Sequence, residues 1–258
     1  MRVLGIGPRD VLTLARQQRS ARNVRGPVLV TGVLAEQLER ELVAGGDPAL
    51  VQTSGEPAEA AVVIRIVAGA ATAEDERVLR VAARALVPVV AVQTADRSVR
   101  LPYVLAEDVV TCPPGSGFPV EAIANRVAAA LGAQGPPLAA SLPVLEDAVM
   151  RRTTTDGALS AAALAALGAG RGPRLPVLAL SQARMRSGLA VARGAEQQEG
   201  GREAAEEIAV PLAAALGAGI AARTLVRRLP FRARLLEGLV AAGTTLGLGA
   251  VFRRLPLR

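Results

Sequence analysis

Residues 61–69 read AVVIRIVAG, and this stretch decides the fold that we expect for the first half of the chain. It is apolar along most of its length, rich in β-branched residues and ended by glycine, which is typical of a buried strand. Similar runs occur at 27–32 (PVLVTG) and 88–94 (PVVAVQT), and weaker ones at 50–53 and 108–112. Continuous apolar strands of this kind are typical of a parallel sheet covered on both faces.

Helical patterns separate these strands. Leucines recur every four residues from Leu34 to Leu42, and Thr72 with Asp75 has the spacing of a capping box at the start of a second helix. A third helix is expected over 119–131, between a proline and a glycine. Strands that alternate with helices predict a small doubly wound parallel-sheet domain.

Pattern and composition divide the chain into four parts. We expect a basic N-terminal helix at 1–25, the α/β domain at 26–133, a linker at 134–141 and a helical domain at 142–258. The last part has no strand pattern, so the expected fold class is α/β plus all-α.

Several helices are expected in the last part. The first two should cover 142–153 and 159–167 as separate elements. A third should cover 176–193, with Met185 and Leu189 on one side.

The composition limits the chemistry that the chain can perform. It contains 258 residues, with no histidine and, because every basic residue is arginine, no lysine. An imidazole base and a Schiff-base lysine are therefore absent. The single cysteine, Cys112, leaves no intrachain disulfide and no site with several thiolate ligands. We expect no enzyme activity and no cofactor.

The net charge of +7 is unevenly distributed along the chain. Residues 1–25 carry +5, residues 26–222 carry −5, and residues 223–258 carry +7. Basic ends on an acidic middle favour an anionic partner for the ends, although arginines can also be solvated helix caps. Nucleic acid is not expected, because only Phe231 and Phe252 could stack on bases near the arginines. The N-terminus lacks the apolar core of a signal peptide, so we expect the cytoplasmic side.

Two apolar segments, Ile208–Ala222 and Gly238–Phe252, flank an arginine-rich stretch. Both are shorter than the ~20 residues that a membrane span needs. Two crossings would also place the intervening arginines on the far side, against the positive-inside rule. We expect helices that pack as a bundle or insert partway, with arginines on anionic headgroups. The arginines expected to contact the membrane are Arg223, Arg227, Arg228, Arg253 and Arg254.

The α/β part resembles an Era-like GTPase domain whose nucleotide-binding motifs are missing. After the strand at 27–32, the chain lacks the GxxxxGK[ST] loop that holds phosphates and magnesium. Where such a domain has NKxD, this chain has Gln93-Thr94-Ala95-Asp96, in which only Asp96 matches. Gly115 and Gly117 lie where a last base-contacting loop would be. The resemblance implies at most weak guanine-nucleotide binding through Asp96, Gly115 and Gly117; otherwise Asp96 caps a turn and the glycines form a flexible loop.

The helical part resembles the YcjF-type domain, a bacterial domain of unknown function that often follows Era-like GTPase domains. The similar segments are SQARMRSGLAVARG (181–194) and ARTLVRRLPFRARLLEGLVAAGTTLGLGAVFRR (222–254). Members are regarded as membrane-associated and have no established reaction. The resemblance therefore implies an architecture and a location.

Three functions remain open from the sequence. The favoured one is a non-catalytic, membrane-associated scaffold whose α/β domain binds an unidentified protein partner. The alternatives are a switch that binds guanine nucleotide weakly and a soluble structural adaptor whose Ala/Gly-rich helices form a core.

Overall fold

The computed structural model describes residues 26–95, 99–168, 185, 188–189, 191–193 and 243. The basic segment 1–25 and the apolar segments 208–222 and 238–252 lie outside these residues, and so do the helices expected there. Two compact units are present, and they divide between residues 149 and 150, inside helix α6 (Pro143–Gly168).

The first unit is built on a sheet of five parallel strands in the order β2-β1-β3-β4-β5. This is one of the two common orders of doubly wound α/β folds. The parallel sheet expected from the apolar runs is confirmed. The strands are β1 (Val28–Gly32), β2 (Val51–Gln52), β3 (Val62–Ala68), β4 (Val89–Thr94) and β5 (Val109–Thr111).

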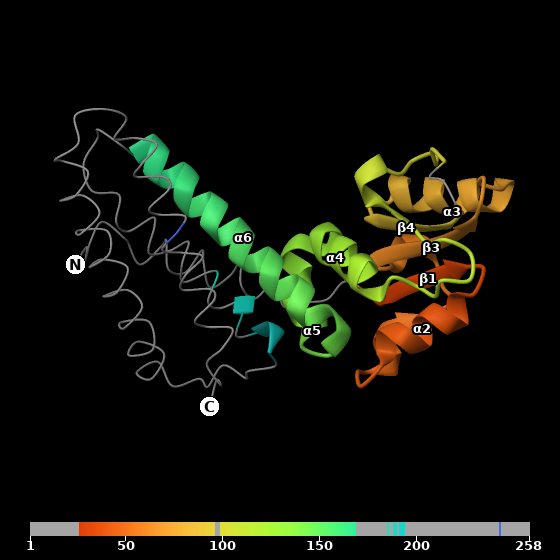
Figure 1. Ribbon diagram of the computed structural model, residues 1–258, viewed down its shortest axis with the longest axis horizontal. Coiled ribbons are helices and arrows are strands. Elements are labelled where there is room, and N and C mark those ends of the chain that lie inside the picture. Colours follow the sequence, from red (N-terminus) through yellow and green to blue (C-terminus); the bar gives the residue numbers. More distant parts are fainter. Residues whose placement is uncertain are drawn as a thin grey trace. The chain divides into compact units, whose positions relative to one another are not determined.

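Helices cover both faces of the sheet. Figure 1 shows α2 and α3 on opposite sides of the strands, as right-handed crossovers in opposite directions from the middle of the sheet require. The α-helices of this unit are α2 (Ala35–Val43), α3 (Ala73–Arg84), α4 (Val120–Leu131) and α5 (Gly135–Ala139), and α6 begins in it. Short 3₁₀ turns are η1 (Pro48–Leu50), η2 (Pro57–Glu59), η3 (Ala106–Asp108) and η4 (Gly132–Gln134).

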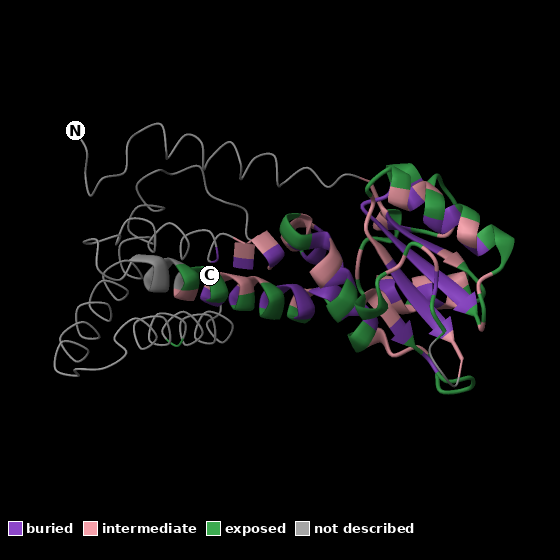
Figure 2. Ribbon diagram, turned by 90° about the horizontal axis from the view of Figure 1, so that it is seen from above, coloured by how far each residue is buried: buried purple, intermediate pink, exposed green. Residues whose placement is uncertain are grey.

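The strands form the buried centre of the unit (Figure 2). On the α3 side, Leu29 and Val63 of the sheet pack with Val78 and Ala82 of the helix. Residues 99–108, the described part of the connection between β4 and β5, contain no α-helix, and Leu101 there is buried in the core. Valine, leucine and alanine therefore fill the core, as the low aromatic content requires.

The capping box expected at the start of α3 is confirmed. The Thr72 hydroxyl accepts a hydrogen bond from the Asp75 backbone N–H at 3.2 Å, and the Asp75 carboxylate accepts one from the Thr72 N–H at 2.8 Å. Two backbone donors that a helix start leaves open are satisfied in this way.

The segment 134–141 was expected to be a linker, but α5 lies within it. Pro136 and Pro137 stand in the first turn of α5, where a proline needs no N–H partner and its fixed φ suits a helix. Two prolines therefore begin a helix here.

The prediction of separate helices over 142–153 and 159–167 is wrong, because α6 is continuous from Pro143 to Gly168. The Thr154 hydroxyl donates to the Met150 carbonyl at 2.8 Å, and the Thr155 hydroxyl donates to the Arg151 carbonyl at 2.9 Å. These bonds occupy the threonine hydroxyls inside the helix rather than in a competing turn.

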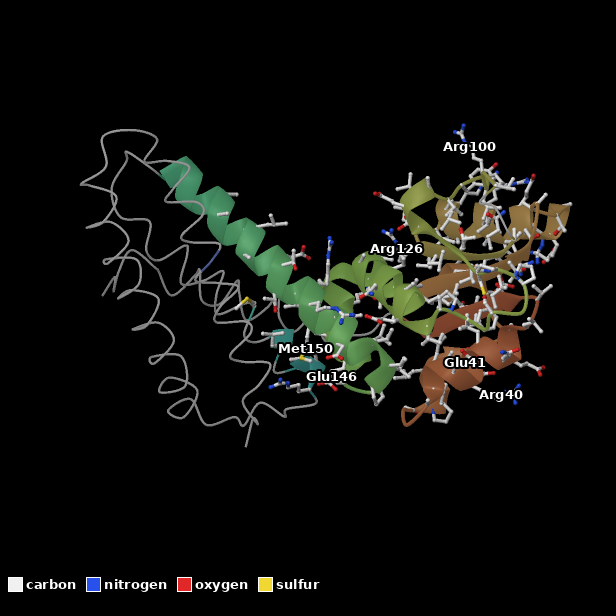
Figure 3. All side chains as sticks on the ribbon, viewed as in Figure 1. Arg40, Glu41, Arg100, Arg126, Glu146 and Met150 are labelled. Carbon is white, nitrogen blue, oxygen red and sulfur yellow. The ribbon has the colours of Figure 1, made fainter. Side chains whose placement is uncertain are left out.

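The buried side expected for the helix at 176–193 is confirmed where it is described, because Met185 and Leu189 are buried. Met185 lies against Gly157 of α6, where a Cβ would stand 2.9 Å from the methionine sulfur. Farther along the chain, Arg193 lies 3.9 Å from Glu146, which is one turn from Met150 on α6 (Figure 3).

Candidate functional site

Doubly wound sheets bind ligands beyond the carboxyl ends of their strands, where the chain leaves neighbouring strands in opposite directions. In this unit that position is between β1 and β3, because β1 leads to α2 on one face and β3 leads to α3 on the other. The segments that reach this edge are 32–34, 69–72, 94–95 and 112–118. Two sequence-predicted site residues, Gly115 and Gly117, lie in the last of them.

The turn from β1 to α2 is short and apolar. Gly32 has a φ of 107°, and a side chain there would collide with the carbonyl oxygen of Ile66. Val33 and Leu34 follow at once, with exposed fractions of 45% and 61%. The Leu34 carbonyl accepts from the N–H groups of Gln37 and Leu38, so α2 begins directly after Leu34. Apolar side chains thus occupy the place of a phosphate loop.

Gln93, at the end of β4, is fully buried, and its side chain is hydrogen-bonded to the loops that follow β3 and β4. Its side-chain N–H donates to the Gly69 carbonyl at 2.5 Å, and its side-chain oxygen accepts from the Val99 N–H at 2.8 Å. Thr94 donates to the Val67 carbonyl at 3.3 Å. The side chains of Gln93 and Thr94 are therefore both engaged with the protein backbone.

The loop at 113–118 closes on itself. The Ser116 hydroxyl donates to the Pro113 carbonyl at 2.6 Å, and the buried Cys112 thiol donates to the Gly117 carbonyl at 3.0 Å. Gly115 and Gly117 are exposed and have left-handed φ values of 79° and 74°. No atom stands within 4 Å of a Cβ position at either glycine, so their conformation requires glycine and their surroundings do not.

The other predicted site residues lie outside the described residues. Asp96 is one of them, so its position relative to Gly115 and Gly117 is not described. The same holds for the five membrane-contact arginines, which are Arg223, Arg227, Arg228, Arg253 and Arg254.

Sequence reasoning missed a buried ion pair beside this edge. Arg65 of β3 and Asp75 of α3 are 8% and 5% exposed, and their Nη2 and Oδ1 atoms lie 2.7 Å apart. The Arg65 Nε also donates to Oδ1 at 2.7 Å, and the Thr72 hydroxyl donates to Oδ2 at 2.7 Å. An arginine inside the apolar run 61–69 is the one sequence signal that pointed to this pair.

The environment of Asp75 stabilises its ionised form. Burial raises the pKa of the Asp75 carboxyl, but the hydrogen bonds from Thr72 and Arg65 outweigh burial and hold that pKa below its ordinary value. Every oxygen of the carboxylate is thus engaged within the fold, and the pair ties α3 to the centre of the sheet.

No group of three or more His, Cys, Asp or Glu side chains in the described part of the chain could hold a metal ion. No helix among the described residues is long and apolar enough to cross a membrane. Comparison of the chain with known protein families, with curated proteins and with solved structures finds no match.

Proposed function

We propose that the chain is a non-catalytic scaffold that attaches to the cytoplasmic side of an anionic membrane and offers its α/β unit to a protein partner. The observation that carries this proposal is the state of the sheet's carboxyl edge. Apolar side chains and polar groups bonded to their own backbone occupy the place where related folds bind ligands.

A nucleotide-binding edge needs backbone N–H groups and polar side chains that are open to phosphate. Here the exposed Val33 and Leu34 lead straight into α2, while the polar groups of Gln93 and Ser116 are bonded within the fold. Exposed neighbouring apolar side chains favour contact with another protein surface. In this proposal the unit is a GTPase-like domain that binds a protein and no longer binds a nucleotide.

Membrane attachment is proposed for the last third of the chain on its sequence. Five arginines flank the two apolar segments there, and the resemblance to the YcjF-type domain favours the same location. Each arginine near an anionic surface contributes about 1 kcal/mol, so five contribute about 5 kcal/mol, or more than a thousandfold in affinity.

The proposal is tested by flotation of the full-length protein with phosphatidylserine-containing vesicles and with neutral phosphatidylcholine vesicles. The matched variant carries glutamine at Arg223, Arg227, Arg228, Arg253 and Arg254. We expect the wild type to float with anionic vesicles only, and the variant to stay in solution. Binding that persists at high salt indicates insertion of apolar segments, because salt screens charge attraction.

Calorimetry with GTP and GDP completes the test. We expect no heat of binding, because the described residues at the carboxyl edge offer no open phosphate site. Measurable binding would favour the nucleotide-responsive switch instead. Failure of the wild type to float with either vesicle would favour a soluble adaptor.

A further inference from the structure

The C-terminal end of α3 carries an apolar side chain where folding favours glycine. The Val87 N–H donates to the Ala82 carbonyl at 3.0 Å, and the Leu86 N–H donates to the Ala83 carbonyl at 3.1 Å. This pair of bonds is a Schellman motif, in which the residue after the C-cap is left-handed and is usually glycine. Leu86 holds that place with a φ of 56°.

Packing does not explain a leucine at this position. The Leu86 side chain is 90% exposed, whereas its neighbour Val87 makes the apolar contact with the core that accompanies a Schellman motif. The strain of the left-handed backbone is therefore not offset by burial within the unit. An outlier of this kind calls for a functional explanation.

The same end of α3 is basic. Arg77, Arg80 and Arg84 are exposed and spaced so that they share one face of the helix. Arg77 pairs with Glu74 at 2.7 Å, but Arg80 and Arg84 make no side-chain bond with any described residue. Arg84 also suits the negative end of the helix dipole, which does not account for Arg80.

We propose that Leu86, Arg80 and Arg84 form a second membrane contact, which rests on the attachment proposed above. Arg84 and Leu86 are two residues apart at the end of α3, and both are exposed. An exposed leucine close in the chain to exposed arginines suits the headgroup layer of an anionic bilayer, because the leucine enters the acyl boundary while the guanidinium groups meet lipid phosphates. This contact holds the α/β unit on the membrane by its α3 end. The carboxyl edge with Val33 and Leu34, at the opposite ends of the strands, stays available to a protein.

The chain has no tryptophan, so one introduced tryptophan reports on one place. In the full-length Leu86→Trp variant, we expect a blue shift of emission with phosphatidylserine-containing vesicles and none with phosphatidylcholine alone. The matched control is Leu34→Trp, because Leu34 is also exposed and left-handed (φ 57°) but precedes a helix whose first turn carries the acidic Glu36. Its emission should stay unchanged with both vesicles.

Two further variants separate this contact from a structural role. Replacing both Arg80 and Arg84 by glutamine should lower vesicle affinity about 25-fold, since each arginine contributes roughly fivefold near an anionic surface. Leu86→Gly should raise the urea midpoint, because glycine relieves the left-handed strain, and should lower vesicle affinity about tenfold. A residue with only a structural role would not shift these two measurements in opposite directions.

The outcomes distinguish the two proposals. Flotation of the wild type with unchanged emission at position 86 would overturn the α3 contact and leave the scaffold proposal standing. A blue shift that survives glutamine at the five arginines of the last third would support the α3 contact and refute attachment by that third. Absence of both flotation and blue shift would overturn both proposals.

Discussion

The Asp75→Ala variant is expected to destabilise the α/β unit by about 4–6 kcal/mol. Removing one partner of a buried ion pair costs about 3–5 kcal/mol, because the remaining charge is left unpaired in the interior. Here the stranded group is the Arg65 guanidinium, which is 8% exposed. Loss of the capping box at Thr72 adds about 1 kcal/mol.

Double-mutant analysis identifies how much of this loss belongs to the pair. Arg65→Met removes the charge and leaves Asp75 bonded to Thr72, so it should cost less than Asp75→Ala, about 1–3 kcal/mol. The double variant should cost at least ~2 kcal/mol less than the sum of the single ones, because no charge is then stranded. The assay is urea unfolding of the full-length protein followed by far-ultraviolet circular dichroism.

The chain offers a matched exposed control. Arg77 and Glu74 also lie 2.7 Å apart, but their side chains are 63% and 57% exposed. Glu74→Ala should have a much smaller effect, because water screens the pair. Equal losses for Asp75→Ala and Glu74→Ala would refute the reasoning that burial makes the Arg65–Asp75 pair important.

The same pair makes stability depend on pH. The folded pKa of Asp75 lies below its unfolded value near 3.8, so its contribution is complete above that value and is lost as pH falls through the folded pKa. The wild type should therefore lose more stability on acidification below about pH 4 than Asp75→Ala does. Parallel acid profiles for the two proteins would contradict the assignment.

Two other substitutions test how the loops around the sheet are held. Gly46→Ala should lower the free energy of unfolding by about 1–3 kcal/mol, because the new Cβ would stand 2.6 Å from the backbone oxygen of Ser141. Thermal unfolding measures this loss, and an unchanged midpoint would contradict the close approach. Gln93→Leu should lower the free energy of unfolding by about 2–4 kcal/mol, because it leaves the Gly69 carbonyl and the Val99 N–H without their buried partner. Thr94→Val is a milder control. Amide exchange at Val99 should become faster in Gln93→Leu, and unchanged exchange would argue against the bond between Val99 N–H and Gln93.

The sheet could be predicted from the sequence because its signals are local. Each strand is an apolar run, and the capping box of Thr72 and Asp75 spans four residues. The continuity of α6 could not be predicted, since threonine and glycine near 153–157 have low helix propensity. The hydroxyls of Thr154 and Thr155 donate to carbonyls one turn earlier, and only the finished helix provides these bonds. Tertiary context there overrides the local preference.

The position of the candidate site could be predicted from the sequence, but the hydrogen bonds of its side chains could not. Gly115 and Gly117 follow β5, so their loop lies at the carboxyl edge of the sheet, as the strand pattern indicates. What the pattern cannot give is where each hydrogen bond goes. Gln93 and Ser116 could have faced a ligand, and only the folded backbone reveals that Gly69 and Pro113 accept their protons. Arg65 likewise meets Asp75 only after the crossover brings α3 over β3.

Among the described residues, the non-glycine positions with positive φ are Leu34, Leu86 and Tyr103, and all three expose large side chains. The backbone strain at these positions is not offset by packing, so folding alone would favour glycine there. Leu34 illustrates this, because it also stands at the N-cap of α2, where leucine is poor and glycine is accepted. Leu34→Gly should therefore stabilise the unit by about 0.5–1 kcal/mol in urea unfolding. Destabilisation instead would mean that the exposed leucine stabilises the fold. Its exposure would then no longer support a docking surface at the carboxyl edge.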